Sequence, residues 1–289
     1  MNASNHPSLD ELLRGQDTIV VPGVYDALSA RIAARAGARA IYMSGFGVAG
    51  ASFGVPDIGL LGPEQMSERV RAIASATSPL PLIADGDNGY GGAPNVARLV
   101  RAYEQAGAQA IQLEDQVSPK RCGHMEGKEL VPLDEAASRI RAAASARSDN
   151  AFKIVARTDA IATDGIDEAL KRANAFLEAG ADILFVEAPR TEAEMARIGE
   201  RFRGVPLLAN LVEDGKTPVL GIDALRQMGY RIVLRPISAL LATARRLEEV
   251  YAELLCGGTQ VGARVSFAQY NEIVGLPEAI AFASRSRRE

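Results

Sequence analysis

The stretch of the sequence that is richest in reactive side chains runs from Glu114 to His124. It places two acids, two cations, a thiol and an imidazole behind one apolar segment. The whole chain has only two cysteines and two histidines, and Cys122 and His124 lie two residues apart here. Lys120 and Arg121 precede the thiol, and such an electropositive setting favours the thiolate form of a cysteine. We therefore interpret this stretch as an active-site loop.

The thiol of Cys122 could act as a nucleophile, as an acid or base, as a metal ligand, or simply as a buried apolar group. A cysteine–histidine hydrolase needs the pair to face each other and a third group to orient it, which is uncommon for neighbours in a loop. General acid or base chemistry, which contributes about 10² to 10⁴ in rate, fits the loop better. Cys256, at the end of a predicted helix, is most simply a packing residue.

Two aspartates one residue apart follow another apolar run, at Asp85 and Asp87. In extended backbone both would lie on the same side, with Cα atoms about 6.5 to 7 Å apart. Mg²⁺ binds through few carboxylates and keeps several waters, so this pair, with Glu114 nearby, favours a magnesium site. A tight turn and a glycosidase-type acid pair are the alternatives. The chain has no tryptophan to stack a sugar, which argues against the glycosidase.

Arg157 closes a further apolar run, where an always-charged guanidinium could bind a substrate carboxylate in a bidentate manner. An ion pair with Glu114 or Glu187 is the structural alternative, and the two roles can coexist. Ser44 and Gly45 could offer a hydroxyl and backbone N–H groups to a carboxylate, although a plain turn would explain them as well. Other polar residues at or near the ends of apolar runs are Tyr42, Asn210, Arg235 and Ser238.

Short apolar, β-rich segments alternate with amphipathic helical segments along the chain, the pattern of parallel βα units. The predicted strands span residues 18–22, 38–44, 79–85, 108–114, 152–158, 182–187, 205–210 and 231–236. The helices expected after them span residues 25–36, 63–77, 95–106, 133–146, 166–179, 192–203, 221–228 and 237–255. Eight units predict an α/β fold, a (β/α)8 TIM barrel, whose active site lies at the carboxyl ends of the strands. The polar residues above fall at those ends.

A doubly wound open sheet is the competing α/β fold. It would normally carry a G-x-G-x-x-G loop between a strand and a helix, and none is present here. One barrel of about 250 residues accounts for nearly the whole chain, so we expect a single domain over residues 1–289. Residues 256–289 are helix-compatible but supernumerary. We expect them to form a C-terminal helical extension, outside the barrel or on a neighbouring subunit.

The composition of the 289 residues narrows the class of protein. With 47% hydrophobic and 24% charged residues it is typical of a soluble globular protein, and no apolar run approaches the roughly 18 residues of a membrane span. A net charge of −4 argues against nucleic-acid binding. The chain has only two histidines, and His6 lies in an N-terminal stretch that is expected to fray, so a zinc site built from histidines is excluded. The same stretch is polar and does not resemble a secretion signal, so a cytoplasmic location is expected. Two cysteines make no disulfide framework.

Several segments, taken together and in order, resemble the signature segments of the isocitrate lyase/phosphoenolpyruvate mutase superfamily. They are Asp85-Gly86-Asp87 with the turn to Gly91, Lys120-Arg121-Cys122-Gly123-His124, and residues 41–45, 55–57, 114–116, 156–160 and 210–213. The resemblance spans nearly the whole chain. It implies a (β/α)8 barrel whose last helices are exchanged between subunits, in a homotetramer built as a dimer of helix-swapped dimers.

The resemblance also implies roles for individual residues. Asp85 and Asp87 would hold Mg²⁺, or alternatively Mn²⁺, directly or through water, with Asp57 and Glu114 as a supporting shell. Cys122 would be the catalytic acid, on a loop that closes over the substrate. The other catalytic residues would be Tyr42, as base or relay, and Arg157. The substrate-binding residues would be Ser44, Gly45, Phe46, Lys120, Arg121, Gly123, His124, Arg157, Glu187, Asn210, Leu211 and Ser238.

Lyases of this superfamily cleave the C2–C3 bond of a 2-hydroxy dicarboxylate by retro-aldol or retro-Claisen chemistry. The branches that act on phosphonates lack the Lys-Arg-Cys-Gly-His loop, so its presence favours a carbon–carbon lyase. Methylisocitrate lyases carry Arg-Pro-Asn after the histidine and usually glycine where this chain has Phe46. Met125-Glu126-Gly127 looks more like 2,3-dimethylmalate lyases, and losing a loop cation suggests a substrate with one carboxylate fewer. Arg235, where relatives often carry an apolar or aromatic residue, leaves the specificity open.

The sequence therefore predicts a Mg²⁺-dependent lyase that splits a 2-methylmalate-type dicarboxylate, such as 2,3-dimethylmalate, into pyruvate and a short carboxylate. Two alternatives use the same site: cleavage of 2-methylisocitrate to pyruvate and succinate, and hydrolysis or decarboxylation of oxaloacetate. A non-catalytic barrel that binds oxo acids is the alternative from a different class. The expected partner is a small dicarboxylate, and neither nucleic acid nor a membrane is expected.

Overall fold

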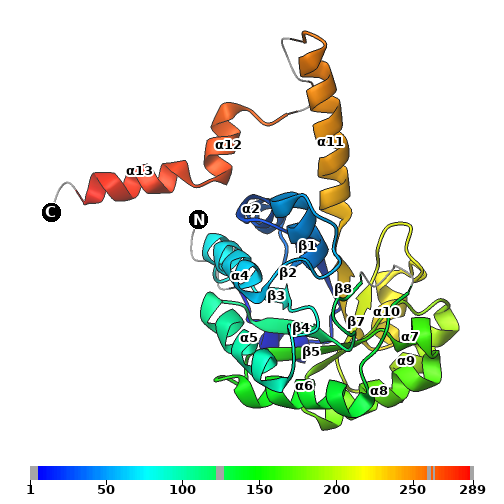
Figure 1. Ribbon diagram of the computed structural model, residues 1–289. Coiled ribbons are helices and arrows are strands. Elements are labelled where there is room, and N and C mark those ends of the chain that lie inside the picture. Colours follow the sequence, from blue (N-terminus) through cyan, green and yellow to red (C-terminus); the bar gives the residue numbers. More distant parts are fainter. Residues whose placement is uncertain (1–5, 122–126, 259–261, 263, 287–289) are drawn as a thin grey trace.

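Eight parallel strands close into a barrel in chain order, with β8 paired to β1 (Figure 1). The computed structural model describes residues 6–121, 127–258, 262 and 264–286. The strands are β1 (Ile19–Val24), β2 (Ile41–Met43), β3 (Leu82–Asp85), β4 (Ala110–Glu114), β5 (Lys153–Thr158), β6 (Ile183–Val186), β7 (Leu207–Asn210) and β8 (Tyr230–Arg235). Each overlaps its predicted strand, and the predicted (β/α)8 fold is confirmed.

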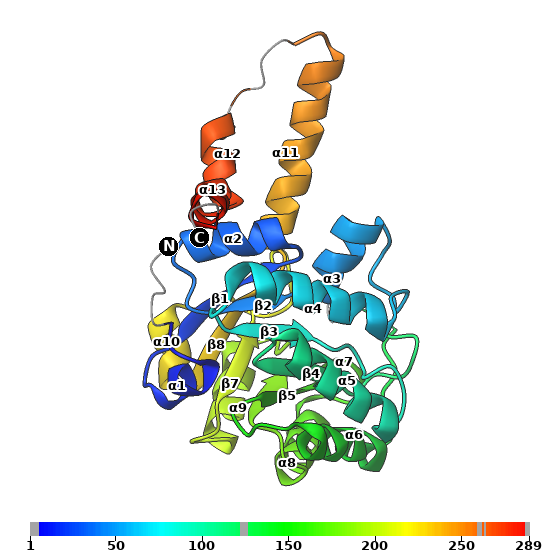
Figure 2. The same ribbon diagram turned by 90° about the vertical axis from the view of Figure 1, so that its left-hand side faces the viewer.

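The helices that follow β1 to β7 form the outer layer of the barrel (Figures 1 and 2). They are α2 (Ala27–Arg35), α4 (Pro63–Thr77), α5 (Ala93–Ala106), α6 (Leu133–Ala146), α8 (Ile166–Glu178), α9 (Glu192–Arg201) and α10 (Ile222–Gln227). The predicted eighth helix, α11 (Ser238–Leu255), follows β8 but projects away from the barrel (Figure 1). Local signals fix several ends. Asp26 caps α2 by accepting from the N–H of Ser29, and Gly107, at φ 98°, ends α5 in the left-handed conformation that glycine adopts most easily.

The N-terminal stretch, expected to fray, forms a short helix instead. Helix α1 (Leu9–Arg14) begins at Ser8, whose side chain makes a capping box with Glu11. Leu9 and Leu12 are buried in the same apolar cluster as inward side chains of the strands, such as Val155. The expectation was wrong because these two leucines add apolar surface to the barrel core, which outweighs the polar character of their neighbours.

Besides α1, three short helical segments were not predicted, and two of them lie directly after strands. Helix α3 (Gly45–Val48) follows β2 and continues into a π-helical turn, η1 (Ala49–Phe53), and α7 (Ala160–Thr163) follows β5. Ser44 caps α3 by accepting from the N–H of Gly47 at 3.1 Å. The plain turn that was the alternative interpretation of Ser44 and Gly45 is therefore the first turn of a helix.

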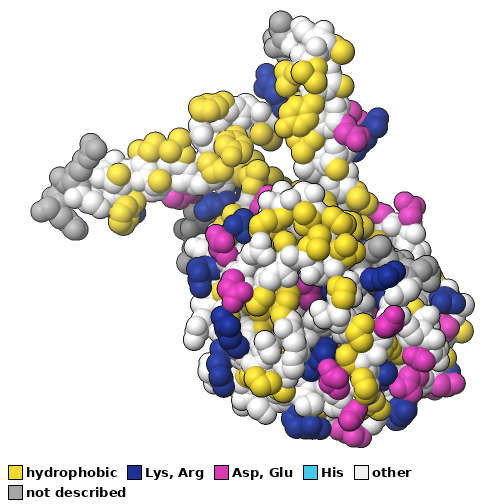
Figure 3. Space-filling model, viewed as in Figure 1, with side chains coloured by type: hydrophobic (Ala, Val, Ile, Leu, Met, Phe, Trp, Pro, Cys, Tyr) yellow, Lys and Arg dark blue, Asp and Glu magenta, His cyan; other side chains and the backbone are white. Residues whose placement is uncertain are grey.

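The last three helices extend away from the barrel (Figures 1 and 2). No residue of α11, or of α13 (Leu276–Arg285), is buried. Helix α12 (Phe267–Ile273) contacts α2, where Arg31 donates to the carbonyl of Ile273 at 3.3 Å. Hydrophobic side chains gather along these helices and on the barrel surface beneath α11 (Figure 3). Within the described ranges, no helix is both long and apolar enough to cross a bilayer.

Candidate active site

A cavity of about 210 Å³ opens at the carboxyl ends of the strands. Most of the predicted site residues line it, namely Tyr42, Ser44, Phe46, Asp57, Asp85, Glu114, Lys120, Arg121, Arg157, Glu187 and Asn210. The rest of its lining is apolar and consists of Phe185, Val212, Leu234, Pro236 and Ile237. One side of the cavity is therefore charged, and the other could contact alkyl groups.

The remaining predicted residues lie around this cavity or outside the described part of the chain. Gly45 lies beside the lining residue Asp85, and a Cβ there would come within 2.8 Å of an Asp85 oxygen, so any other residue would force that carboxylate to shift. Leu211 is buried beside the lining residue Val212, and Ser238 donates to Glu213 instead of facing the cavity. The predictions for Cys122, Gly123 and His124 fall on residues outside those that the structure describes.

A turn, rather than extended backbone, brings Asp85 and Asp87 together. Asp87 has a φ of 48°, and its N–H donates to Oδ1 of Asp85 at 3.1 Å. Oδ2 of Asp85 accepts from the N–H of Gly45 at 3.2 Å. Of the two backbone geometries considered from the spacing, the turn is present and the extended backbone is not, because a side-chain-to-backbone hydrogen bond of this kind stabilises a local turn. Both carboxylates are nevertheless buried; Asp85 lines the cavity, whereas Asp87 is not among its lining residues.

Lys120 joins two of the acids. Its ammonium forms ion pairs with Asp57 and, at 2.8 Å, with Oδ1 of Asp87. The other Asp87 oxygen accepts from the hydroxyl of Tyr90 at 2.8 Å. Burial disfavours the charged form of Lys120, but Asp87 and the other nearby carboxylates raise its pKa well above the usual range. Lys120 is therefore a permanent cation beside the predicted metal ligands.

Two acids of the site, Asp85 and Glu114, lie where ionisation is unfavourable. Burial, together with the charge of Asp87, raises the pKa of Asp85 to about 6. Burial also raises the pKa of Glu114 well above its ordinary value, although Arg157 opposes this shift. Oε1 of Glu114 and Oδ1 of Asn210 are buried and accept no hydrogen bond from any described residue. A hard cation would relieve both conditions, because it binds oxygen ligands and adds positive charge.

The residues present thus fit a Mg²⁺ ion held by few protein ligands. Among the described residues, no three histidine, cysteine, aspartate or glutamate side chains gather closely enough to form a complete site. Asp85 and Asp87 would hold the ion, and water or substrate oxygens would complete its coordination, as is usual for Mg²⁺.

Arg157 is held from behind by Asp159. Nε and Nη2 of Arg157 each donate to one oxygen of Asp159 at 2.9 Å. Nη2 also lies 3.4 Å from an oxygen of Glu187, and the guanidinium lies 5.1 Å from the centre of the Phe185 ring. Arg157 therefore lines the cavity, as predicted, and also forms the ion pair with Glu187 that was the structural alternative. The edge of the guanidinium formed by Nε and Nη2 is taken by Asp159, so only its other edge can meet a substrate carboxylate.

Tyr42 donates a hydrogen bond from its hydroxyl to the side-chain oxygen of Gln112 at 3.0 Å. Burial and the charge of Asp85 raise the pKa of Tyr42 well above its ordinary value, so the phenol stays protonated near neutral pH. Of the two roles implied by resemblance, this environment favours a relay over a free base.

Sequence reasoning missed three buried residues of the site: Gln112, Asp159 and Lys128. Gln112 lies on β4 two positions before Glu114, hence on the same face of the strand, and this spacing was the signal that could have found it. Asp159 follows β5 directly. No spacing rule pointed to Lys128, which reaches Asp159 from a segment distant in sequence.

The ends of the loop that carries Lys120 are tied together. The Gln116 side chain accepts from the N–H of Arg121 and donates to its carbonyl, both at 2.9 Å. The backbone N–H of Val117 donates to the carbonyl of Glu129, also at 2.9 Å. These bonds fix where Lys120 and Arg121 enter the cavity.

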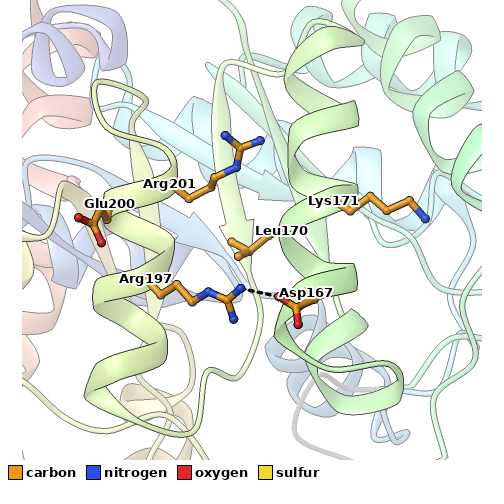
Figure 4. Close-up of a pocket in the computed structure, with 6 residues that line it drawn as sticks. All are labelled: Asp167, Leu170, Lys171, Arg197, Glu200 and Arg201. Atoms are coloured by element: carbon orange, nitrogen blue, oxygen red, sulfur yellow. Dashed lines mark hydrogen bonds and ion pairs between the residues drawn. The ribbon is translucent and has the colours of Figure 1, made fainter.

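A second hollow, of about 600 Å³, lies between α8 and α9 on the outer layer (Figure 4). An ion pair between Arg197 and Asp167 crosses it, and both side chains are well exposed. Lys171, Arg201 and Glu200 also line it, so its charges are mixed, and it holds none of the residues expected to do chemistry. We do not assign a site there.

The fold and the cavity define a class of protein: a (β/α)8 barrel with a cavity lined by acidic and basic side chains at the carboxyl ends of its strands, where barrel enzymes have their active sites. The family model described as phosphoenolpyruvate phosphomutase matches residues 9–255. The chain therefore belongs to this family, within the PEP mutase/isocitrate lyase superfamily. The resemblance stated from the sequence is confirmed.

Relatives with assigned names are similar over most of their length. The chain is 44% identical to a 2,3-dimethylmalate lyase of Eubacterium barkeri, over 92% of each protein. It is 45% identical to a 2-methylisocitrate lyase of Salmonella typhimurium, covering 86% of this chain and 84% of that protein. The predicted enzyme class, a carbon–carbon lyase, agrees with these names.

Solved structures give the same picture of the fold. An oxaloacetate acetylhydrolase in complex with 3,3-difluorooxalacetate has a TM-score of 0.92 at 35% identity, covering 96% of each chain. A phosphonopyruvate hydrolase complex with oxalate and Mg²⁺ has a TM-score of 0.85 at 34% identity, covering 96% of this chain and 97% of that one.

Proposed function

We propose that this protein is a Mg²⁺-dependent carbon–carbon lyase that cleaves a 2-methylmalate-type dicarboxylate, such as 2,3-dimethylmalate, to pyruvate and a short carboxylate. The observation that carries the proposal is the two-sided cavity. Its acids, Lys120 and Arg157 suit a metal and carboxylates, whereas Phe46, Val212 and the neighbouring apolar wall suit methyl groups. Its volume of about 210 Å³ fits a small substrate. The similarity to a 2,3-dimethylmalate lyase supports the same substrate class.

The residues divide the work of the reaction. Asp85 and Asp87 would hold Mg²⁺, with Asp57 and Glu114 in support, and the bound ion supplies positive charge that offsets the charge developing on substrate oxygens. Ser44, Gly45 and Phe46 would contact the oxo-acid portion together with Arg157 and Asn210. Glu187 would act through its contacts with Asn210 and Arg157, at 3.2 and 3.4 Å.

In the proposed reaction the C2 hydroxyl passes its proton through Tyr42 to water. The C2–C3 bond then breaks: C2 becomes the carbonyl carbon of pyruvate, and the bond electrons leave as the enolate of the short carboxylate. Cys122 would protonate the former C3, which is the enolate carbon, and would regain a proton from water after the products leave. Lys120, Arg121 and His124 would bind the anion and favour proton transfer. Excluding water protects the reactive enolate until this proton arrives.

Two other activities use the same residues. Cleavage of 2-methylisocitrate is favoured by the similarity to the Salmonella typhimurium lyase, and oxaloacetate hydrolysis by the TM-score of 0.92 to oxaloacetate acetylhydrolase. A non-catalytic oxo-acid-binding barrel would need the same ligands but no proton donor. The buried, charge-rich site argues for chemistry, because buried carboxylates with raised pKa cluster at functional sites.

A substrate panel tests the proposal. The purified protein with Mg²⁺ is offered 2,3-dimethylmalate, 2-methylisocitrate, oxaloacetate and phosphonopyruvate, and pyruvate and oxalate are measured. We expect pyruvate, most efficiently from 2,3-dimethylmalate. Pyruvate mainly from 2-methylisocitrate, or oxalate from oxaloacetate, would select the alternatives, and no pyruvate from any malate-type acid would overturn the lyase.

We also propose a helix-swapped homotetramer located in the cytoplasm. A groove of about 1090 Å³ lies between α2 and α11, and Val20, on the outer face of β1, is 47% exposed there. Outer faces of barrel strands are normally covered by helices. The apolar side chains along α11–α13 of a second copy, such as Phe267, Ile280 and Phe282, would supply that cover. Light scattering of the purified protein measures the assembly.

A further inference from the structure

Behind the cavity, one buried carboxylate is shared by two cations. Asp159 accepts from Arg157 through both of its oxygens and from the ammonium of Lys128 through Oδ1, all at 2.9 Å. The Asp159 and Lys128 side chains are 0% and 1% exposed. Charge-assisted hydrogen bonds in such a dry environment are strong and directional, so the orientation of each group depends on the others.

The two cations come from different parts of the fold. Arg157 lies on β5, and Asp159 follows the end of that strand, whereas Lys128 belongs to the segment between Gly127 and α6. That segment is fixed to the end of β4, because the N–H of Val131 donates to the carbonyl of Asp115 at 2.9 Å. Lys128 therefore approaches Asp159 from a segment outside β5, and Asp115 contacts both that segment and the end of β5.

The backbone of Asp159 is also held in place. Its N–H donates to Oδ1 of Asp115 at 3.0 Å, and Oδ2 of Asp115 in turn accepts from the hydroxyl of Thr158 at 2.7 Å and from Arg172 at 3.2 Å. With the backbone fixed, the remaining freedom of Asp159 is rotation of its carboxylate. Oδ1, which receives Lys128, is the same oxygen that receives Nη2 of Arg157.

We propose that Lys128 is a positioning residue that holds the Asp159 carboxylate in the orientation that fixes the guanidinium of Arg157 in the cavity. This inference rests on the proposed function, in which Arg157 binds the substrate. Lys128 itself does not line the cavity. Its effect on the reaction is therefore exerted through Asp159.

The test compares Lys128→Met with Lys153→Met. Lys153 lies at the other end of the same strand as Arg157 and makes a 2.8 Å ion pair with Asp10, so it matches Lys128 in residue type and partner but is remote from the cavity. Oxalate affinity is measured by calorimetry with Mg²⁺, and kcat and KM are measured with the substrate that the panel identifies. For Lys128→Met we expect about a tenfold or greater loss of oxalate affinity, with a similar rise in KM and a smaller change in kcat, as for lost binding.

The control and the double variant separate positioning from general stability. Lys153→Met should lower the unfolding midpoint and leave oxalate affinity unchanged. The losses of oxalate affinity caused by Lys128→Met and by Asp159→Asn should not add in the double variant, because residues that act through one another are coupled. Additive losses, or equal losses from Lys128→Met and Lys153→Met, would overturn the proposal.

A crystal structure of Lys128→Met gives a result independent of activity. We expect Arg157 to turn away from its two hydrogen bonds with Asp159. If Arg157 were unchanged in this variant, the positioning role would be overturned. Failure of the proposed function would look different: the wild-type protein would bind no oxalate and cleave no malate-type acid.

Discussion

The side-chain amide of Gln112 donates a hydrogen bond to Oδ1 of Asp85 at 3.3 Å. The same side chain accepts the hydroxyl of Tyr42 at 3.0 Å. Because Gln112 is fully buried on β4, it joins a predicted metal ligand on β3 to a cavity tyrosine on β2 across the barrel interior. An amide can serve both neighbours at once, since it has a donor end and an acceptor end.

Replacing Gln112 with leucine should therefore weaken Mg²⁺ binding. Loss of a group that orients a metal ligand typically costs about 10- to 100-fold in metal affinity. Calorimetric titration with Mg²⁺ measures this affinity. Gln109→Leu is the matched control: Gln109 is another glutamine close to β4, but its oxygen accepts from the N–H of Leu9, in α1, at 2.8 Å. Equal Mg²⁺ affinities for the two variants would show that Gln112 does not orient the site.

Replacing Cys122 with serine should leave Mg²⁺ and oxalate binding intact and reduce turnover by about 10² to 10⁴, the usual contribution of a positioned proton donor. A serine hydroxyl is similar in size but a far weaker acid than a thiol. Cys256→Ser is the control, because Cys256 is an exposed free thiol at the end of α11. Undiminished turnover in Cys122→Ser would remove the thiol from the mechanism.

The sequence was sufficient to predict the barrel because each strand is a short apolar run and each helix an amphipathic one. It also placed Asp85, Glu114 and Arg157 at strand ends that meet in one cavity. The direction of α11 could not be read from the chain. Its apolar side chains predict a helix equally well whether they pack on their own barrel or remain exposed, as Leu247 and Tyr251 do here.

The contacts behind the cavity depend on tertiary structure. Lys128 and Asp159 are 31 residues apart in sequence. No local rule connects them, because the distance between them is set by how β5 and the segment after the loop pack. The turn at Asp87 was only one of the alternatives, because the spacing of the two aspartates suits extended and bent backbone alike. The bend depends on hydrogen bonds from Asp87 and Gly45 to Asp85.

The buried pair of Asp159 and Arg157 should make stability fall in acid. Burial opposes ionisation of Asp159, but Arg157 and Lys128 outweigh it and lower its pKa from 3.8 to about 2. A carboxyl with a depressed folded-state pKa stabilises the protein above its unfolded pKa of about 3.9 and loses that contribution as pH falls towards the folded value. This contribution amounts to about 2 kcal/mol at neutral pH.

Comparing Asp159→Asn with the wild type isolates this contribution, because the amide does not titrate. Urea unfolding at pH 7, 4, 3 and 2.5 should show the variant to be less stable than the wild type at neutral pH. The gap between their free energies of unfolding should narrow below about pH 4. A gap that stays constant down to pH 2.5 would mean that Asp159 is not preferentially ionised in the folded state.

Phe46 should set the preference for methyl-substituted substrates. Its ring lines the cavity on α3, and Phe46→Ala would enlarge the apolar side. We expect kcat/KM for 2,3-dimethylmalate to fall about 10- to 200-fold, the range associated with losing hydrophobic contact with one small group, and larger substrates such as 2-methylisocitrate to lose less. Phe53→Ala is the control, since Phe53 lies in the adjoining η1 segment, is 40% exposed and does not line the cavity. If Phe46→Ala lowered kcat/KM equally for both substrates, the ring would be supporting the fold of α3. The preference between substrates would then have to come from other residues of the cavity.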